Sequence, residues 1–152
     1  MQKRVTADHD GDIVVFIIGM RVNKWWNIKS WWPVFMAMPP MMKELYTDRS
    51  LGFLSHDTAV SGRTIVLTQY WESTDQLLDY AHGHTHKSAW IDFYKKAAKS
   101  EAVGVFHETY DVRAGAYESV YSRMGKPRGL VKATAERSLA DDSSAKARLH
   151  YS

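Results

Sequence analysis

Three histidines at alternate positions, His82, His84 and His86, precede an aromatic run that includes Trp90 and Phe93. Trp90 and Phe93 belong to an apolar stripe at helical spacing, and His86 lies on the same stripe one turn earlier. Rings around an imidazole shield it from water, so its proton affinity becomes adjustable and suits a general base. A hydrogen-bonded core histidine is the alternative interpretation of His86. His82 and His86 have the spacing of paired metal ligands but lack a carboxylate between them, so the sequence predicts no metal site.

A second set of reactive side chains lies in a segment that alternates as a strand does. His107 falls on one face, whereas Glu108 and Tyr110 fall on the other. His107 can accept a proton near neutrality, and Tyr110 can donate to a developing oxyanion. A buried Glu108 would mark a strand edge or a polar site. Arg21, at the end of an earlier strand, is either a rim residue or an anion-holding group at a cavity mouth. With Arg21, the candidate catalytic residues are complete.

Large rings and thioethers crowd residues 25–42. Pro39–Pro40 predicts a break that divides this stretch into two short helical pieces, with Ser30 as the first N-cap. The segment is interpreted as core filler or as a deformable wall for an apolar ligand. An interfacial membrane anchor is disfavoured because the stretch lacks a basic amphipathic face. The candidate substrate-binding residues share bulk and low polarity: Trp31, Trp32, Met36, Trp71, Trp90 and Phe93.

Composition excludes several classes of function. The 152 residues include no cysteine, so disulfides, thiol nucleophiles and iron–sulfur clusters are absent. No apolar run is long enough to cross a bilayer, and the N-terminus has no signal-peptide pattern, so we expect a cytoplasmic protein without a membrane partner. No phosphate loop, nucleophile elbow or dinucleotide fingerprint occurs.

The hydrophobic periodicity predicts an α+β fold. Strands are expected at 13–22, 51–59, 66–71 and 103–110, with helices at 30–46 and around Trp90. This order is the ferredoxin-like βαββαβ unit with an antiparallel sheet. The first strand is apolar on both faces, so the domain's helices can cover only one of them. We therefore expect a homodimer in which a second copy of the sheet covers the other.

The net charge of +3 belongs to the C-terminal part of the chain. Residues 126–152 carry six basic and three acidic side chains, whereas the first 125 residues are balanced. A folded basic stripe is therefore lacking, and no nucleic-acid partner is expected. The sequence divides into a barrel domain at 1–125 and a basic tail at 126–152, interpreted as a flexible extension or an arm that folds over a partner.

Three segments resemble a known family: residues 86–90, 103–110 and 117–121, which read HKSAW, VGVFHETY and YESVY. They are similar to the small monooxygenase-like proteins typified by a member from the fumagillin cluster, whose wider relatives are dimeric α/β barrels. That resemblance implies either cofactor-free oxidation of a phenol or haem bound through a histidine of the second helix. In this chain Trp90 occupies the haem ligand's position and His86 lies one turn earlier.

Three functions follow as hypotheses. The first is a monooxygenase-like oxidoreductase of specialised metabolism that acts without a cofactor on an apolar aromatic or polyene molecule, with His86 or His107 as base and Tyr110 or Arg21 holding the oxyanion. The second replaces this mechanism with haem, using His86 as the axial ligand. The third is a non-catalytic dimer that binds a hydrophobic ligand.

Overall fold

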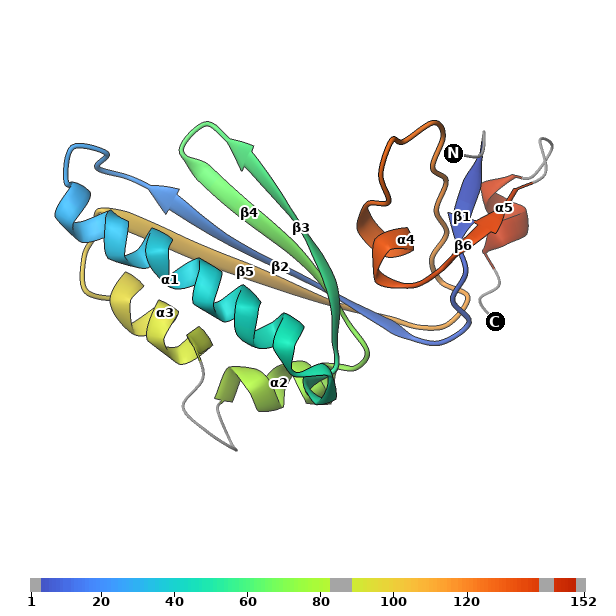
Figure 1. Ribbon diagram of the computed structural model, residues 1–152, viewed down its shortest axis with the longest axis horizontal. Helices are drawn as coiled ribbons and strands as arrows, with labels where there is room; N and C mark the ends of the chain where they lie inside the picture. Colours follow the sequence, from blue (N-terminus) through green and yellow to red (C-terminus); the bar gives the residue numbers. More distant parts are fainter. Residues whose placement is uncertain (1–3, 83–88, 140–143, 150–152) are drawn as a thin grey trace.

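A four-stranded antiparallel sheet forms the centre of the molecule (Figure 1). The computed structural model describes residues 4–82, 89–139 and 144–149. The strands lie in the order β3-β4-β2-β5. Their bounds are Ile13–Val22 for β2, Phe53–Ser61 for β3, Thr64–Trp71 for β4 and Val103–Val112 for β5. With the helices between them, the elements run strand–helix–strand–strand–helix–strand, which confirms the ferredoxin-like α+β fold.

Three helices cover one face of this sheet (Figure 1). They are α1 at Ile28–Thr47, α2 at Thr74–His82 and α3 at Ala89–Ala97, with a short 3-10 turn, η1, at Arg49–Leu51. Within the described residues, no helix is long and apolar enough to cross a membrane. The core lies between the helices and the sheet, because alternate residues of β2, among them Phe16 and Ile18, point toward the buried stripe of α1.

The helix α1 continues through Pro39 and Pro40, so the expected division into two helical pieces is wrong. A helix-interior proline costs about 3 kcal/mol because it removes a hydrogen bond and crowds the preceding turn. The buried stripe of α1 on the sheet offsets that cost. Its N-cap is Asn27 rather than Ser30. Five side chains form this stripe: Val34, Ala37, Met38, Met41 and Leu45.

The opposite face of the sheet carries apolar side chains that the helices do not cover. On β2 this face includes Val15 and Ile17, both partly exposed, and Gly19. The ring of Phe106 on β5 lies directly over Gly19, where a Cβ atom would overlap it. Phe106 and Tyr110 remain 42% and 49% exposed on this face. Residues 13–20 of β2 are thus apolar on both faces, as its alternation predicts, although Glu108 lies beside Ile17 on the open face.

The chain ends form a second, smaller structure beyond one end of the sheet (Figure 1). Its strands β1, Val5–Ala7, and β6, Glu136–Ser138, pair antiparallel, and two short helices accompany them, α4 at Gly129–Ala133 and α5 at Ala145–Arg148. Residues 129–138 of the predicted tail therefore pack on their own chain. Leu130 and Val131 of α4 are buried.

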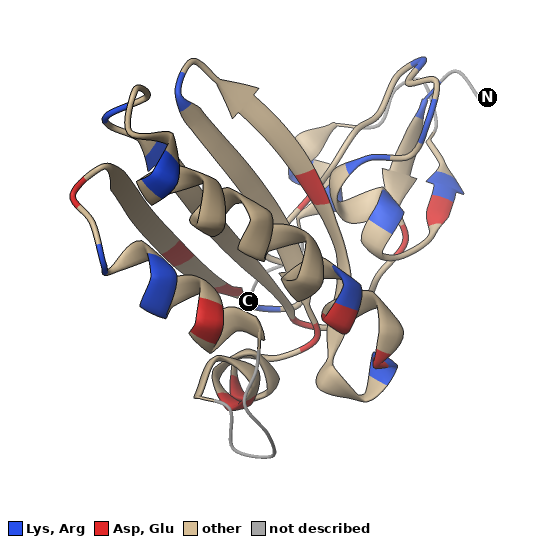
Figure 2. Ribbon diagram, turned by 60° about the vertical axis from the view of Figure 1, so that its left-hand side comes forward, with Lys and Arg blue, Asp and Glu red and all other residues tan. Residues whose placement is uncertain are grey.

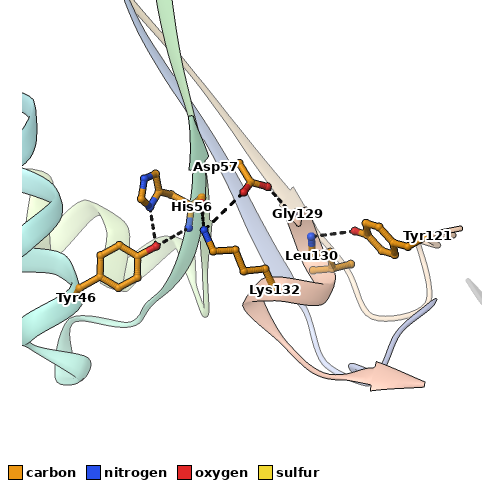
Figure 3. Close-up of polar contacts among 7 residues, drawn as sticks. All are labelled: Tyr46, His56, Asp57, Tyr121, Gly129, Leu130 and Lys132. Carbon is orange, nitrogen blue, oxygen red and sulfur yellow. Dashed lines mark hydrogen bonds and ion pairs between the residues drawn. The ribbon is translucent and has the colours of Figure 1, made fainter. Parts of the chain in front are cut away.

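Polar contacts fasten α4 to the edge strand β3 (Figure 3). Asp57 accepts a hydrogen bond from the backbone N–H of Gly129 at 2.5 Å and lies 3.6 Å from Lys132 Nζ. Tyr121 Oη accepts from the backbone N–H of Leu130 at 3.1 Å. Gly129 has φ +59°, a left-handed conformation that favours glycine. The first turn of α4 is thus held by side chains from two separate segments.

Candidate functional site

An apolar groove of about 190 Å³ lies between α1 and the neighbouring strands β3 and β4. Its floor is strand residues and its wall is the proline-containing part of α1. Methionine and proline give this wall an adaptable, nonpolar surface. The lining residues are Phe35, Met38, Pro39, Met42, Thr58, Ile65 and Leu67. This groove is smaller than the roughly 300–1,000 Å³ typical of ligand pockets, so it suits one ring or a short chain segment.

Tyr46 and His56 form a hydrogen-bonded pair, which Figure 3 shows, and each follows or precedes a groove-lining residue on its own element. Tyr46 follows Met42 by one turn of α1, and His56 lies on the same face of β3 as Thr58. Tyr46 Oη is 2.6 Å from His56 Nδ1 and also accepts the backbone N–H of His56 at 3.2 Å. The phenol therefore contacts two nitrogen groups at once, one of them able to take up its proton.

The surroundings of His56 favour its neutral form. Burial lowers the pKa of His56, and the positive charge of Lys132 lowers it further, whereas Asp57 opposes both effects. Lys132 Nζ donates to the backbone oxygen of His56 at 2.6 Å, which fixes the cation beside the ring. Gln69 pairs with His56 across the sheet, is fully buried and donates to the Met42 sulfur at 3.8 Å. The pKa of His56 is thus lower than that of an ordinary histidine, and His56 lies two residues along β3 from the groove-lining Thr58.

A second cavity, of about 490 Å³, lies in the terminal structure between β1, β6 and α5. It is larger than the groove, but the two arginines that line it already pair with carboxylates. Arg148 Nη2 is 2.9 Å from Glu118 Oε2, and Arg137 Nε is 3.6 Å from Asp8 Oδ1. The hydroxyl of Tyr117 donates to two backbone oxygens of the first loop. We therefore place the candidate site in the groove rather than in this cavity.

His107 lies on the helix-covered face of β5, beside α3. Its Nδ1 is 3.0 Å from Tyr94 Oη, and its ring contacts Phe16 with centroids 5.6 Å apart. Burial raises the pKa of Tyr94 to about 12, so this phenol keeps its proton near neutrality. The side chain of His107 is exposed on its outer side. The arrangement fits an edge histidine held by a tyrosine, and its part in chemistry stays a prediction.

Glu108, Tyr110 and Arg21 lie on the other face of the sheet. Tyr110 Oη donates to Glu108 Oε2 at 3.1 Å, and this contact raises the pKa of Tyr110. Arg21 instead bonds Asn23 Oδ1 at 2.5 Å near the far end of β2. Tyr110 pairs with Val15, so six residues separate it from Arg21 along the strands, or about 20 Å. The structure therefore does not bring these residues to His107 or to one another as a single site.

The aromatic candidates divide into buried and exposed groups. Trp71 and Phe93 are fully buried, and Trp90 packs against Phe16 and Tyr80 in the same core. Trp31 is partly buried. By contrast, Trp32 and Met36 are 49% and 45% exposed on the outer face of α1. Trp32 and Trp31 both contact the groove-lining Phe35, Trp32 by stacking with centroids 5.6 Å apart and Trp31 edge-on at 6.4 Å.

His84 and His86 lie outside the described residues, and His82 is the last residue of α2. The axial-ligand hypothesis for His86 is therefore untested. The described side of α3 that the resemblance assigns to haem is filled by Trp90 and Phe93, 7% and 0% exposed. This packing suits a core rather than a haem pocket. Among the described residues, no group of three or more histidine and carboxylate side chains could hold a metal ion.

The sequence did not single out Tyr46, His56 or Asp57. A histidine and an aspartate next to each other on a strand look like ordinary edge residues. The alternation of a strand predicts which face a side chain is on, but it does not predict which residue of another element that side chain contacts. The signal that could have drawn attention to them is local. Tyr46 lies in the last turn of the helix that precedes this strand, and only a short connection separates the two elements. Its ring can therefore reach the first residues of the strand.

The four-stranded antiparallel sheet with helices on one face defines a ferredoxin-like α+β domain. A family model, Monooxygenase af470-like, matches residues 13–130, and the chain belongs to this family. A curated relative is Monooxygenase af470 of Aspergillus fumigatus, which is 33% identical over 61 residues. That segment covers 40% of this chain and 22% of the relative, so the chain corresponds to only part of it.

Solved structures share the architecture at low sequence identity. The aldoxime dehydratase OxdRE, whose structure was determined with butyraldoxime, superposes with a TM-score of 0.62 at 17% sequence identity. The superposition covers 87% of this chain and 40% of the dehydratase chain. A Nitrosomonas europaea protein assigned to the antibiotic biosynthesis monooxygenases gives a TM-score of 0.50 at 13% identity and covers 68% and 93%. Both likenesses show the fold alone.

Proposed function

We propose that the protein is a monooxygenase-like oxidoreductase that acts on an apolar aromatic or polyene molecule held in the groove beside α1. The proposal rests on the apolar groove and on the Tyr46–His56 pair, because Tyr46 follows the groove-lining Met42 by one turn of α1 and His56 precedes the groove-lining Thr58 by two residues of β3. An apolar wall selects a nonpolar substrate by burying its surface, and one polar group at the end orients it. Membership of the monooxygenase family supports the class of reaction.

The pair can remove a proton from a bound phenol or enol. Tyr46 Oη takes the substrate's O–H proton while its own proton moves to His56 Nδ1, 2.6 Å away. The electron pair of the broken O–H bond stays on the substrate, which becomes an electron-rich anion, and His56 becomes an imidazolium. Molecular oxygen is the oxidant that such an anion would reduce. One oxygen atom would become a carbonyl at a substrate C–H position, and the other would leave as water with that hydrogen and the proton held by His56. His86 and His107 stay the alternative bases.

Two other functions remain proposals with separate signatures. Haem bound through His86 would give the purified protein a Soret absorption band, although the packing of Trp90 and Phe93 does not favour it. A non-catalytic dimer that binds a hydrophobic ligand would take the ligand into the same groove but consume no oxygen. Absorption spectra and oxygen uptake therefore separate the three functions.

A second copy of the chain is the proposed cover for the open face of the sheet. The support is the row of partly exposed apolar side chains on that face, including Ile17, Phe106 and Tyr110. Exposed apolar side chains that gather on one face of a folded domain often mark an interface. A two-fold arrangement would place the same face of each copy against the other.

The test uses the whole protein with a single-ring phenol and a short linear polyene as probes, because the groove suits one ring or a short chain segment. Oxygen uptake is recorded without added cofactor, and probe binding is followed by quenching of tryptophan fluorescence. Thr58→Trp, which fills the groove, should abolish binding and uptake. Tyr46→Phe and His56→Gln should retain binding and lower the rate by about 100-fold or more, the usual contribution of a positioned acid or base.

Val60→Trp is the matched control for Thr58→Trp. Val60 lies on the same face of β3 as Thr58 but outside the groove, and its side chain is 71% exposed. The control should bind the probes like the unaltered protein. If Thr58→Trp still binds the probes, the groove is not the binding site. If Tyr46→Phe and His56→Gln both keep full oxygen uptake, the base is His86 or His107 instead.

A further inference from the structure

The helix α1 is apolar on its outer face as well as on the face that it buries. Its sequence contains three charged residues, Lys29, Lys43 and Glu44. A helix that is hydrophobic all round is normally covered on all sides. Here the outer face remains open, with Ile28, Trp32 and Met36 recurring at four-residue spacing and exposed by 56%, 49% and 45%.

The loop that leads into α1 extends this apolar surface. Trp25 and Trp26 are 60% and 64% exposed, the highest values for any tryptophan in the chain. The loop is held in place, because Trp31 Nε1 donates to the backbone oxygen of Trp25 at 2.9 Å and Asn27 N donates to Lys24 O. It lies at one end of the molecule (Figure 1). The two indole rings are therefore exposed on a loop whose backbone is held by hydrogen bonds.

Cations surround these aromatic residues. Lys24 and Lys29 come from the loop and the first turn of α1, and Arg21 and Arg63 both bond Asn23, two residues before Trp25. None of the four has a salt bridge within the described part of the chain. Figure 2 shows positive residues on the loop before α1, on its first turn and at the tip of the β3–β4 hairpin. Glu101 is a neighbouring carboxylate, but its one negative charge does not cancel the four positive charges. This end of the molecule therefore stays positive.

We propose that the surface formed by Trp25, Trp26, Ile28 and Trp32, with its surrounding lysines and arginines, docks onto an anionic lipid bilayer. Tryptophan side chains favour the level of the lipid headgroups, and lysine and arginine reach the phosphates while their stems lie along apolar surface. The sequence argued against a membrane anchor because residues 25–42 lack a basic face. The fold supplies the missing charge from β2 and the β3–β4 hairpin.

Docking in this orientation would bring the groove close to the lipid. Trp32 stacks on Phe35, and Phe35 lines the groove, so the docking surface and the groove are continuous. If the proposed function holds, an apolar substrate could pass from the bilayer to the groove without crossing water. The docking surface itself stands on the exposed rings and the cations, whether or not the groove is catalytic.

Vesicle co-sedimentation with the whole protein tests the proposal. Vesicles of phosphatidylcholine alone are compared with vesicles that contain about 30% phosphatidylserine, which mimics an anionic leaflet. The protein should sediment with the anionic vesicles, its tryptophan emission should shift to the blue, and salt at about 0.5 M should weaken binding. The double variant Trp25→Ser/Trp26→Ser and the double variant Lys24→Glu/Lys29→Glu should each bind at least about tenfold more weakly.

Matched controls change similar residues at distant places. Leu78→Ser removes a side chain on α2 that is 44% exposed, and Lys126→Glu/Arg128→Glu makes the same charge change in an exposed loop. Both should bind vesicles as the unaltered protein does, and circular dichroism confirms that every variant is folded. Failure of the unaltered protein to bind either vesicle, or equal binding by the tryptophan variant, would overturn the proposal. A smaller oligomer in the tryptophan variant, together with no vesicle binding by the unaltered protein, would also overturn the proposal. That result would assign the surface to a contact between protein copies.

Discussion

At the scale of single residues, the candidate chemistry depends on which side of the sheet a side chain meets. His56 and Asp57 are neighbours in the chain but point to opposite faces of β3. His56 meets Tyr46 of α1, whereas Asp57 meets Gly129 and Lys132 of the terminal structure. Lys132 contacts both residues, so the charge that docks α4 also lowers the pKa of His56.

The stability of the protein should depend on pH through His56. Its pKa is lower in the folded protein than in the unfolded chain, so the unfolded chain takes up a proton first as the pH falls. The contribution is therefore fully present above the ordinary histidine pKa of about 6.5 and is lost as the pH falls from there through the folded value. Urea unfolding between neutral and mildly acidic pH should show a steeper loss for the unaltered protein than for His56→Gln.

A charge variant checks the cause of this shift. Lys132→Gln should raise the pKa of His56, because the second-largest influence on it is removed while Asp57 remains. Nuclear magnetic resonance titration of the imidazole protons measures the change, and Lys29→Gln, at the other end of α1, serves as the control. An unchanged pKa in Lys132→Gln would show that the ammonium group does not act on the ring.

Periodicity predicted the faces of the strands because each side chain's direction depends only on its position in its own strand. His107 was correctly separated from Glu108 and Tyr110 on this basis. Periodicity could not predict the Tyr46–His56 contact, which depends on the register between α1 and β3. It also could not show that Trp71 and Phe93 are buried while Trp32 is exposed, because large rings on a helix or strand look alike in sequence.

At the scale of elements, the difference between prediction and structure is concentrated in α1 and α4. Proline chemistry predicted a break in α1, but tertiary packing of its buried stripe overrides local preference. The composition of residues 126–152 predicted a loose tail, since large apolar residues are few. Two of them, Leu130 and Val131, are nevertheless buried, and backbone contacts to Asp57 and Tyr121 hold the first turn.

Asp57→Ala should lower the free energy of unfolding by about 1–2 kcal/mol. The substitution removes a charge-assisted hydrogen bond to Gly129 N and an ion pair, and Asp57 is only 21% exposed. Asp92→Ala is the matched control, because its ion pair with Lys96 joins neighbouring turns of α3 and both side chains are well exposed. That control should cost less than about 0.5 kcal/mol. Equal losses in urea titrations of the two variants would show that Asp57 does not hold α4.

At the scale of the whole molecule, three surfaces differ in character. The open face of the sheet is a row of partly covered apolar side chains, the groove is a small recess beside α1, and the end with Trp25 and Trp26 is aromatic and cationic. The open face lies on β2 and β5, whereas the groove and the aromatic, cationic end both use α1 and meet where Trp32 stacks on Phe35. Substitutions on the open face, such as Phe106→Lys, should therefore leave the groove and the aromatic end unchanged.

The last prediction concerns the open face of the sheet. Light scattering at micromolar concentration should give about twice 17.4 kDa for the unaltered protein, because burying this face against a second copy removes apolar surface from water. Phe106→Lys should shift the mass toward one chain, since two like charges would then face each other across the two-fold axis. Val60→Lys adds the same charge to an exposed position on the other face of the sheet and should remain dimeric. A single-chain mass for the unaltered protein would contradict the barrel, and a dimer that persists in Phe106→Lys would place its interface elsewhere on the molecule.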